Sequence, residues 1–420
     1  MLRNKKIIGS VLAAAAFALL PLVSTHAQIG PHVDVTYNNV GFTRSINGGT
    51  SGSASGCNGT VIGVYGSSAL KGYIQQAAKD FCANTAANPN HYDVEYAAGG
   101  DSCPGDVFAS TDGTDPIVGV SDVFAPSCAA DQQAAVDATT INDALLSVNV
   151  VDEVATCPGA QQPNGGAVNP AGPTVCGAFS TDPGASGATS CSPAALSLAQ
   201  AQLLYNQQIG NERSVGGCVH SNAVQNRVTG SGTRITFCFN VFGPGTDNCQ
   251  NEGSAQALAP TTGTEVNDVC GPTAADGNYA QGYVTRSAIV GDPRSTSSPK
   301  TALQGCGVVT VGGFSGYNGT CNPTNPATNN SPSPVDGVNN CNGDNDVAAG
   351  RYQIWGYEHL VTNVAGNAAA ASFVAFLTTS ANGSTEDVTL TRAQGFMQQC
   401  QMGFKRTDDA GPYSTQTATC

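Results

Sequence analysis

The stretch Val61-Ile-Gly-Val-Tyr-Gly-Ser-Ser-Ala-Leu70 decides the fold more clearly than any other part of the sequence. Its first five residues form an apolar run that predicts a buried strand, and Gly66 with two serines predicts a polar turn. Beyond the turn, apolar residues recur at the spacing of one helix face between Tyr73 and Phe81. A buried strand, a glycine turn and a helix make one unit of a parallel α/β sheet.

Two further strands end in small or polar residues, as the first one does. The alternating segment from Tyr92 to Tyr96 leads to Gly100-Asp101-Ser102, and Ile117 to Val120 leads to Ser121-Asp122. In open α/β sheets, ligands bind beyond the carboxyl ends of the strands. We therefore expect the polar ends of the three strands to meet at one binding site.

A second polar motif, Arg227-Val-Thr-Gly-Ser-Gly-Thr233, precedes an apolar run from Ile235 to Phe242. Its glycines let the backbone approach a ligand, and a helix that begins here would direct free N–H groups and its positive dipole end at the same point. Arg227 would add one full positive charge as a bidentate fork. The motif predicts an oxyanion site, although the same residues could form an ordinary helix cap and an ion pair.

The first 27 residues have the pattern of a secretory signal peptide. Three cationic residues precede an apolar stretch from Ile7 to Val23, and Thr25-His26-Ala27 supplies a cleavage point before Gln28. No other run is long and apolar enough to span a bilayer. These features predict a periplasmic or secreted protein with no membrane insertion after signal cleavage.

The sixteen cysteines all lie in the mature part, which in an exported chain indicates up to eight disulfides. Their connectivity does not follow from the sequence, although Cys238 with Cys249 and Cys306 with Cys321 are close enough to staple local loops. Neither C-x-x-C nor a cluster of His and Cys is present, so we expect no metal site and no cofactor.

The mature chain is strongly acidic. Removing the three signal-peptide cations leaves 13 Lys and Arg against 30 Asp and Glu, a net charge of 13 − 30 = −17. Such a surface disfavours nucleic acid or an anionic membrane as a partner. An oxyanion could still be held by backbone dipoles and a single arginine, because salt screens charges beyond about 8 Å.

About 390 mature residues exceed what one core usually serves, so two lobes are expected. We predict lobe I over residues 28–155, lobe II over 156–345, and a return to lobe I over 346–420, with 157–191 as a stapled insertion or a crossing between lobes. Ser192-Pro193 is typical of the cap and first turn of a helix that ends at Gly210. Trp355 is expected to fill the core near the hinge. Further predicted elements are strands at 281–290 and 306–311, a loop at 318–345, a return strand at 349–359, a helix at 363–378, and a strand or short helix at 396–404.

These pieces, in this order, resemble the periplasmic phosphate-binding proteins that feed ABC transporters, within the two-lobed solute-binding proteins of type II. The matches are Gly66-Ser67-Ser68, Gly100-Asp101-Ser102, Ser121-Asp122 and Arg227 to Thr233. The segment from Val335 to Trp355 is also similar to the pattern at which the family's chain returns to its first lobe. The resemblance covers about residues 59 to 378, and only the arginine motif is highly specific.

The resemblance implies a two-lobed α/β fold in which each lobe is a mixed, mostly parallel sheet flanked by helices, here with disulfide-stapled insertions. It implies a monomeric, non-enzymatic protein that captures phosphate or a similar tetrahedral oxyanion in an interlobe cleft, for uptake through an ABC transporter permease. Asp122 would select the ligand, because a carboxylate accepts a hydrogen bond from hydrogen phosphate and repels sulfate, which carries no proton. The implied ligand-binding residues are Ser67, Ser68, Ser102, Asp122, Arg227, Ser231, Gly232 and Thr233.

Two residues depart from the family pattern. Thr229 stands where the family has an aspartate that orients the arginine, and Asp101 stands where a hydroxyl residue is usual. The residues therefore specify an oxyanion more firmly than they specify phosphate. A secreted hydrolase is disfavoured, because the sequence has neither Gly-x-Ser-x-Gly nor His-Glu-x-x-His. The remaining alternative is an extracellular structural or adhesive protein on the same scaffold that has lost or changed its ligand.

Overall fold

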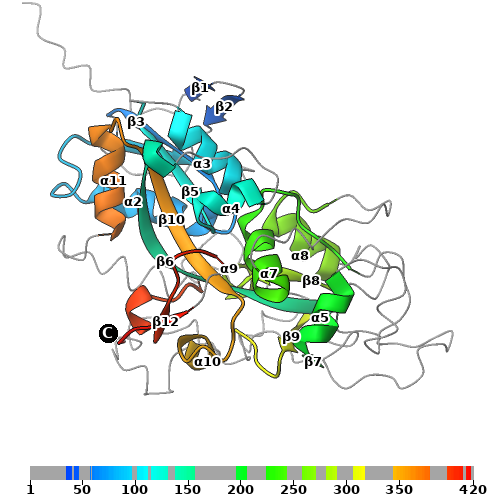
Figure 1. Cartoon of the computed structure of the whole chain (residues 1–420). Coiled ribbons are helices and arrows are strands. Elements are labelled where there is room, and N and C mark those ends of the chain that lie inside the picture. The colour runs from blue at the N-terminus through cyan, green and yellow to red at the C-terminus, as the bar shows by residue number, and fades with distance from the viewer. Residues whose placement is uncertain are drawn as a thin grey trace, which may run out of the picture.

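A mixed sheet of eight strands joins the two halves of the molecule, whose structure is a computed structural model (Figure 1). The strand order is β4-β3-β5-β10-β6-β9-β7, and β8 pairs with β6 beside this path. The signal peptide and the insertion at 157–191 lie outside the described residues. The structure describes residues 35–39, 42–46, 57, 59–96, 102–111, 115–130, 138–156, 195–205, 224–243, 258–270, 281–290, 306–316, 344–378, 395–409 and 413–417.

The first half of the sheet is parallel, as the sequence predicts. β3 (Val61–Gly66) pairs in parallel with β4 (Asp93–Tyr96) and β5 (Ile117–Ser121). The apolar residues of these strands form one core with α2 (Lys71–Ala83) and α11 (Ala368–Thr378), in which Phe81 packs against the rings of two phenylalanines of α11. Burial of this helix face explains why the helical spacing of the sequence was a reliable signal.

Gly66 makes the turn after β3 possible. Its φ is 141°, and a side chain there would overlap the carbonyl group of Val120, so only glycine fits. The backbone then turns so that the N–H of Ser67 donates to Val120 O at 2.8 Å. The predicted glycine turn is therefore present, and it holds Ser67 beside the end of β5.

Two long antiparallel strands cross from the first half of the molecule to the second. They are β6 (Ile141–Thr156) and β10 (Trp355–Asn363), which pair along most of their length with a shift between Glu358 and His359. The sequence analysis missed β6 altogether. The return strand begins at Trp355 and not at residue 349, because a turn with Gly350 at φ 71° first follows the short helix α10 (Asp344–Ala348).

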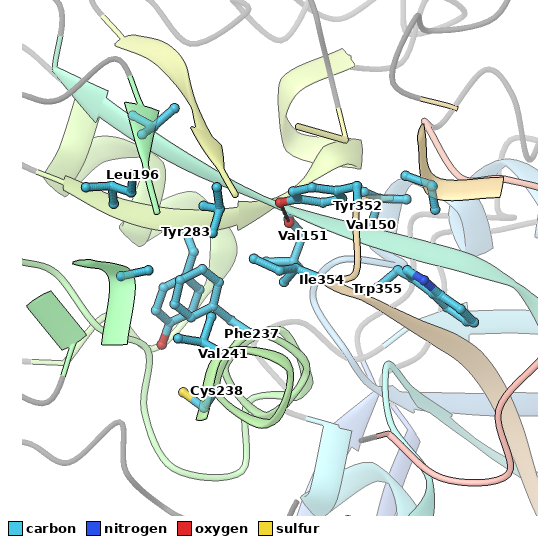
Figure 2. Packing of buried hydrophobic residues seen from close by; sticks show 14 of the residues in the cluster. Val150, Val151, Leu196, Phe237, Cys238, Val241, Tyr283, Tyr352, Ile354 and Trp355 are labelled. Carbon is cyan, nitrogen blue, oxygen red and sulfur yellow. Dashed lines mark hydrogen bonds between the residues drawn. The ribbon is translucent and has the colours of Figure 1, made fainter. Parts of the chain in front are cut away.

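The second half of the sheet is built on the far end of β6. β8 (Gln281–Thr285) and β9 (Cys306–Val311) pair antiparallel with β6, and β7 (Ala195–Leu196) pairs in parallel with β9. In the core beside them, the rings of Phe237 and Tyr283 stack with centroids 4.3 Å apart (Figure 2). The helices of this half are α5 (Leu198–Tyr205), α7 (Gly232–Phe242), α8 (Thr262–Cys270) and α9 (Arg286–Val290).

Three predicted elements of this half need correction. The helix expected from Ser192-Pro193 begins at Leu198, because Ser197 and Gln200 form a reciprocal capping box: each side chain accepts a hydrogen bond from the other's backbone N–H. The strand expected over 281–290 ends at residue 285 and continues as α9. The expected loop at 318–345 gives way to α10 two residues early.

Arg406 joins the C-terminal segment to β10. Its guanidinium lies 4.0 Å from the ring centroid of Trp355 and 4.5 Å from that of Tyr413, and it donates to Trp355 O. Trp355 is fully buried, which confirms the predicted core position. The remaining short elements are β1 (Val35–Asn39), β2 (Phe42–Ile46), α3 (Ser102–Thr111), α4 (Ala125–Ala130), η1 (Ala138–Thr140), η4 (Gln399–Gln401), β11 (Phe404–Lys405) and β12 (Ser414–Thr415).

Two disulfides, Cys57–Cys82 and Cys103–Cys128, staple the first half of the structure. Cys238 is also disulfide-bonded. The suggested pairings with Cys249 and Cys321 cannot be followed, since both partners lie outside the described residues. In the part of the chain that the structure describes, no helix is long and apolar enough to cross a membrane, and no group of three or more His, Cys, Asp or Glu residues could hold a metal ion.

Candidate anion-binding site

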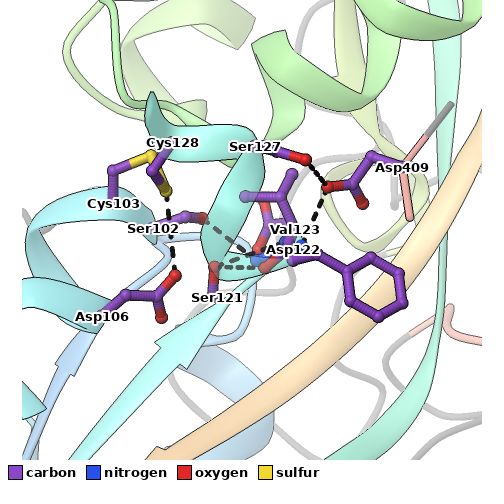
Figure 3. Close-up of a disulfide and its surroundings, with 10 residues drawn as sticks. Ser102, Cys103, Asp106, Ser121, Asp122, Val123, Ser127, Cys128 and Asp409 are labelled. Carbon is purple, nitrogen blue, oxygen red and sulfur yellow. Dashed lines mark hydrogen bonds between the residues drawn. A yellow bond between two sulfur atoms is a disulfide. The ribbon is translucent and has the colours of Figure 1, made fainter. Parts of the chain in front are cut away.

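The polar residues that follow β4 and β5 contact the start of α7. Thr233 Oγ1 donates to Asp122 Oδ2 at 3.1 Å, and the N–H of Asp122 donates to Ser102 Oγ at 3.1 Å. Figure 3 shows Ser102 and Asp122 next to the Cys103–Cys128 disulfide. All three polar residues are 1% exposed. Segments 131 positions apart therefore meet at one buried carboxylate.

Gly232 allows this close approach. A methyl group added at Gly232 would lie 2.6 Å from Asp122 Cβ and closer still to Ser102 Oγ. The preceding Ser231 caps α7, because its Oγ accepts a hydrogen bond from Arg234 N at 3.4 Å. The predicted helix start is thus observed, with Ser231 as cap and Gly232 as first residue.

Arg227 is buried and turns toward the start of α8. Its Nε donates to Ala259 O at 3.0 Å, Nη2 donates to Pro260 O at 3.4 Å, and Nη1 donates to Thr262 Oγ1 at 3.0 Å. Thr262 also joins the first half of the molecule, because its Oγ1 lies 3.2 Å from Ser68 Oγ and its N–H donates to that oxygen at 3.3 Å. Thr262 therefore links the two predicted site residues Ser68 and Arg227.

The sequence analysis did not select Thr262. The only signal was the run of hydroxyl residues after Pro260, which is typical of a helix N-terminus. The structure bears out that signal, since Thr261 Oγ1 accepts from Thr264 N at 3.1 Å at the start of α8. Nothing in the sequence indicated which residue this helix start would face.

The absence of an aspartate at Thr229 is compensated by other groups. Two backbone carbonyls and Thr262 orient the guanidinium of Arg227. Glu265 of α8, fully buried, also interacts electrostatically with Arg227. Burial raises the pKa of Glu265 to about 8, and the nearby Arg227 acts against that rise. Arg227 is thus held in a fixed orientation by these groups.

The electrostatics of Asp122 fit an acceptor in a buried site. Burial raises its pKa, and polar interactions with Ser67, Glu358 and Thr233, together with the charge of Arg227, lower it. Ser67 also accepts a hydrogen bond from Ala69 N at 3.1 Å. Two opposing effects therefore act on the pKa of Asp122. Desolvation favours the protonated acid, whereas nearby donors and positive charge favour the carboxylate.

The predicted residues form two connected groups. Asp122 contacts Ser67, Ser102 and Thr233, while Ser68 reaches Arg227 through Thr262, and Arg227 acts electrostatically on Asp122. Asp101 lies outside the described residues. That these residues bind a ligand stays a prediction.

The two halves of the molecule are in direct contact around this site. Ile235 and Phe239 of α7 pack against Val123 and the Cys103–Cys128 disulfide. Ser287 Oγ of α9 donates to Ala69 O at 3.2 Å, at the turn that carries Ser67 and Ser68. Of the predicted site residues, only Ser68 is partly exposed. The structure is therefore closed over the site.

The comparisons with known proteins support the fold. No protein-family model matches the chain, and no curated protein matches its sequence. Among solved structures, a protein from Clostridium perfringens, assigned as a phosphate ABC transporter substrate-binding protein and solved with bound phosphate, superposes with a TM-score of 0.50 at 15% identity, over 81% of this chain and 99% of that one.

Two further structures cover similar shares at lower TM-scores. An ABC-type phosphate transport receptor from Vibrio cholerae has a TM-score of 0.43 at 15% identity, over 80% of this chain and 99% of that chain. A phosphate-binding protein from Stenotrophomonas maltophilia has a TM-score of 0.39 at 14% identity, over 81% and 90%. The match to the Clostridium perfringens structure shows that the chain has the two-lobed α/β fold of that protein, so the resemblance noted in the sequence is confirmed in the fold.

Proposed function

We propose that this protein is an exported solute-binding protein that captures phosphate or a similar tetrahedral oxyanion between its lobes, for uptake through an ABC transporter permease. The observation that carries the proposal is the contact between Thr233 at the start of α7 and Asp122 after β5. It supports the idea that hydroxyls, backbone N–H groups and one arginine, far apart in sequence, serve a single small anion.

The closed arrangement implies a hinge motion for ligand exchange. Asp122, Arg227 and Thr233 are each 1–2% exposed, so an anion can reach them only when the halves separate. β6 and β10 run through both halves, which makes them the hinge in this proposal. We place the lobe boundaries near residues 155 and 345, and the protein in the periplasm or outside the cell, on the strength of the sequence.

We also infer a non-enzymatic role, which the chemistry of the site supports. The described residues around Asp122 and Arg227 are hydroxyls, backbone groups and carboxyls, and the one described histidine near them, His359, is paired with Asp143 at 2.8 Å. The hydroxyl of Thr233 is hydrogen-bonded to a carboxylate, and no hydroxyl among them is hydrogen-bonded to His359. A phosphatase assay on the purified protein is expected to show no turnover.

A structural or adhesive role on the same scaffold is the second candidate. It is favoured by Arg227, whose three side-chain nitrogens each donate to a group of the protein itself. An arginine engaged in this way could hold α8 in place without any ligand. The two functions differ in whether Arg227 also contacts an anion when the lobes close.

Equilibrium binding of labelled phosphate separates the two functions. The protein is unfolded to strip bound ligand and refolded with its disulfides intact, and uptake is expected at micromolar phosphate. Arg227→Gln should abolish phosphate binding. The control is Arg351→Gln, which removes the same charge from an arginine that is about half exposed and pairs with Asp346. This control should bind phosphate normally. No uptake by the unsubstituted protein would favour the structural role.

A further inference from the structure

Two buried acids face each other at the centre of the site. Asp122 is 1% exposed and follows β5, and Glu358 is fully buried in β10. In the antiparallel pairing of these strands, His359 lies opposite Ser121 at the end of the ladder, so Glu358 and Asp122 are the next residue on each strand. Their side chains interact directly with each other. Like charges in directly opposed positions destabilise a sheet, so two ionised carboxylates would not be stable here.

Within the described part of the chain, three of the four carboxyl oxygens of the pair have no hydrogen-bond donor. Asp122 Oδ2 accepts from Thr233, but Asp122 Oδ1 and both side-chain oxygens of Glu358 are buried with no hydrogen-bond partner among the described residues. Ser147, which lies opposite Glu358 on β6, does not bond to it. Buried carboxylate oxygens without donors are costly, and a single proton on one of the two acids would supply the missing donor.

The other charged groups near the pair divide between the two signs. Arg227 attracts Asp122, and Asp106 of α3 repels it. Further from the pair, Asp143 and Asp409 act on Asp106, and His359 acts on Asp409. Arg227 and the hydroxyl of Thr233 both act on Asp122, so they favour the ionised form of Asp122 over that of Glu358.

Burial and the neighbouring Asp122 raise the pKa of Glu358 well above its usual range. Burial raises the pKa of Asp122 too, but four interactions oppose that rise, and one of them comes from Glu358 itself. The direction of the two shifts agrees with the geometry: the proton belongs on Glu358.

We propose that Glu358 stays protonated in the folded protein and donates a hydrogen bond to Asp122. This hydrogen bond keeps Asp122 ionised, as the acceptor of the oxyanion site. Glu358 is a positioning residue, because it acts on the ligand through Asp122. The ligand part of this inference rests on the proposed function, whereas the shared proton does not. When Glu358 loses its proton, a second negative charge faces the site and the anion is repelled.

Two measurements test the pair. Infrared spectra at about pH 7 should show the C=O band of a protonated, buried carboxyl group that disappears in Glu358→Gln. Phosphate affinity of the unsubstituted protein should fall at the alkaline pH at which this carboxyl band disappears, while Glu358→Gln, whose amide also donates to Asp122, should lose less affinity over the same pH change.

Glu153→Gln is the matched control. Glu153 is also a buried glutamate whose pKa burial raises, to about 8, but it accepts hydrogen bonds from Tyr205 and Gln281 and does not contact Asp122. This variant should lose a different carboxyl band and keep the alkaline loss of affinity.

The outcomes separate the two proposals. A spectrum in which Glu358→Gln removes no band would overturn the shared proton, and an alkaline loss that Glu358→Gln leaves unchanged would overturn the positioning role. If Glu358→Gln does not fold, the unsubstituted protein still decides: phosphate affinity that stays constant while the buried carboxyl band disappears with rising pH would contradict the positioning role. If phosphate does not bind at all, the proposed function and the positioning role fail together, and the infrared band alone decides the proton.

Discussion

Thr233 Oγ1 donates a hydrogen bond to Asp122 Oδ2 at 3.1 Å, across the contact between the start of α7 and the end of β5. The two oxygens of a carboxylate offer about four lone-pair sites, so Asp122 can accept from Thr233 and Glu358 and still accept from a ligand that carries a proton. This arrangement makes Asp122 the residue that distinguishes one tetrahedral anion from another, if the protein binds such anions as we propose.

Asp122→Asn is expected to lose the preference for phosphate over sulfate. The amide no longer repels sulfate, which removes a penalty of several kcal/mol, while the other donors keep much of the phosphate affinity. Calorimetric titration of ligand-free protein with both anions measures the two affinities. If the substituted protein discriminates as well as the unsubstituted one, Asp122 does not face the ligand.

Thr262→Ala is expected to weaken phosphate binding about tenfold. The substitution removes the hydroxyl that holds the guanidinium of Arg227 beside Ser68, and a hydrogen bond to a charged group contributes about 1.5 kcal/mol. Thr262→Ser keeps the hydroxyl and should bind almost normally. Equal losses in both variants would point to altered packing and not to a lost hydrogen bond.

Gly232→Ala is expected to prevent closure. The new methyl group would overlap Asp122 Cβ and Ser102 Oγ, so α7 would have to move away from β5. Small-angle scattering should show a larger radius of gyration, and phosphate binding should be lost. Gly263→Ala in α8 is the control, because a methyl group there meets only Thr261 Oγ1, at 3.8 Å, and alanine favours a helix over glycine by about 1 kcal/mol. A closed, binding-competent Gly232→Ala would contradict the close contact.

The protein is expected to be more stable at mildly acidic than at mildly alkaline pH. Burial raises the pKa of both Glu153 and Glu265 to about 8, from an ordinary value of 4.5 that applies once the chain unfolds. The folded state therefore holds these protons more tightly, and stability declines as the pH rises from 4.5 toward 8.

Thermal unfolding at about pH 5.5 and pH 8 measures this decline, because each pKa unit corresponds to about 1.4 kcal/mol. Glu153→Gln removes one of these two titrating carboxyls, so it should reduce the difference in melting temperature between the two pH values. A melting temperature that rises toward pH 8 would show that these two carboxyls are ionised in the folded protein.

The local patterns that the sequence predicted well are those in which neighbouring residues settle the conformation. The run before Gly66 gave β3, and the glycine turn gave the position of Ser67, because strand, turn and helix are adjacent in the chain. The cap Ser231 and the start of α7 followed from the Gly-Ser-Gly motif in the same way.

The features that the sequence did not reveal depend on distant partners. β6 has polar residues such as Asn149 and Asp152 among its apolar ones, and they are buried only because strands from both halves cover them. Thr262 gained its place in the site from the approach of Ser68, 194 positions away. Glu358 appeared as one acid in an apolar strand, and only the register of β10 with β5 shows what it faces.

The length of β6 affects how the protein unfolds. Its 16 residues form a ladder with β10 over residues 141–150 and ladders with β8 and β9 over residues 151–156. Each lobe needs part of β6 to complete its sheet. A mutation that unfolds one lobe should therefore unfold the other as well. Limited proteolysis should accordingly release no intact lobe, and engineering either lobe as a free-standing fragment would first require a substitute for the shared strand.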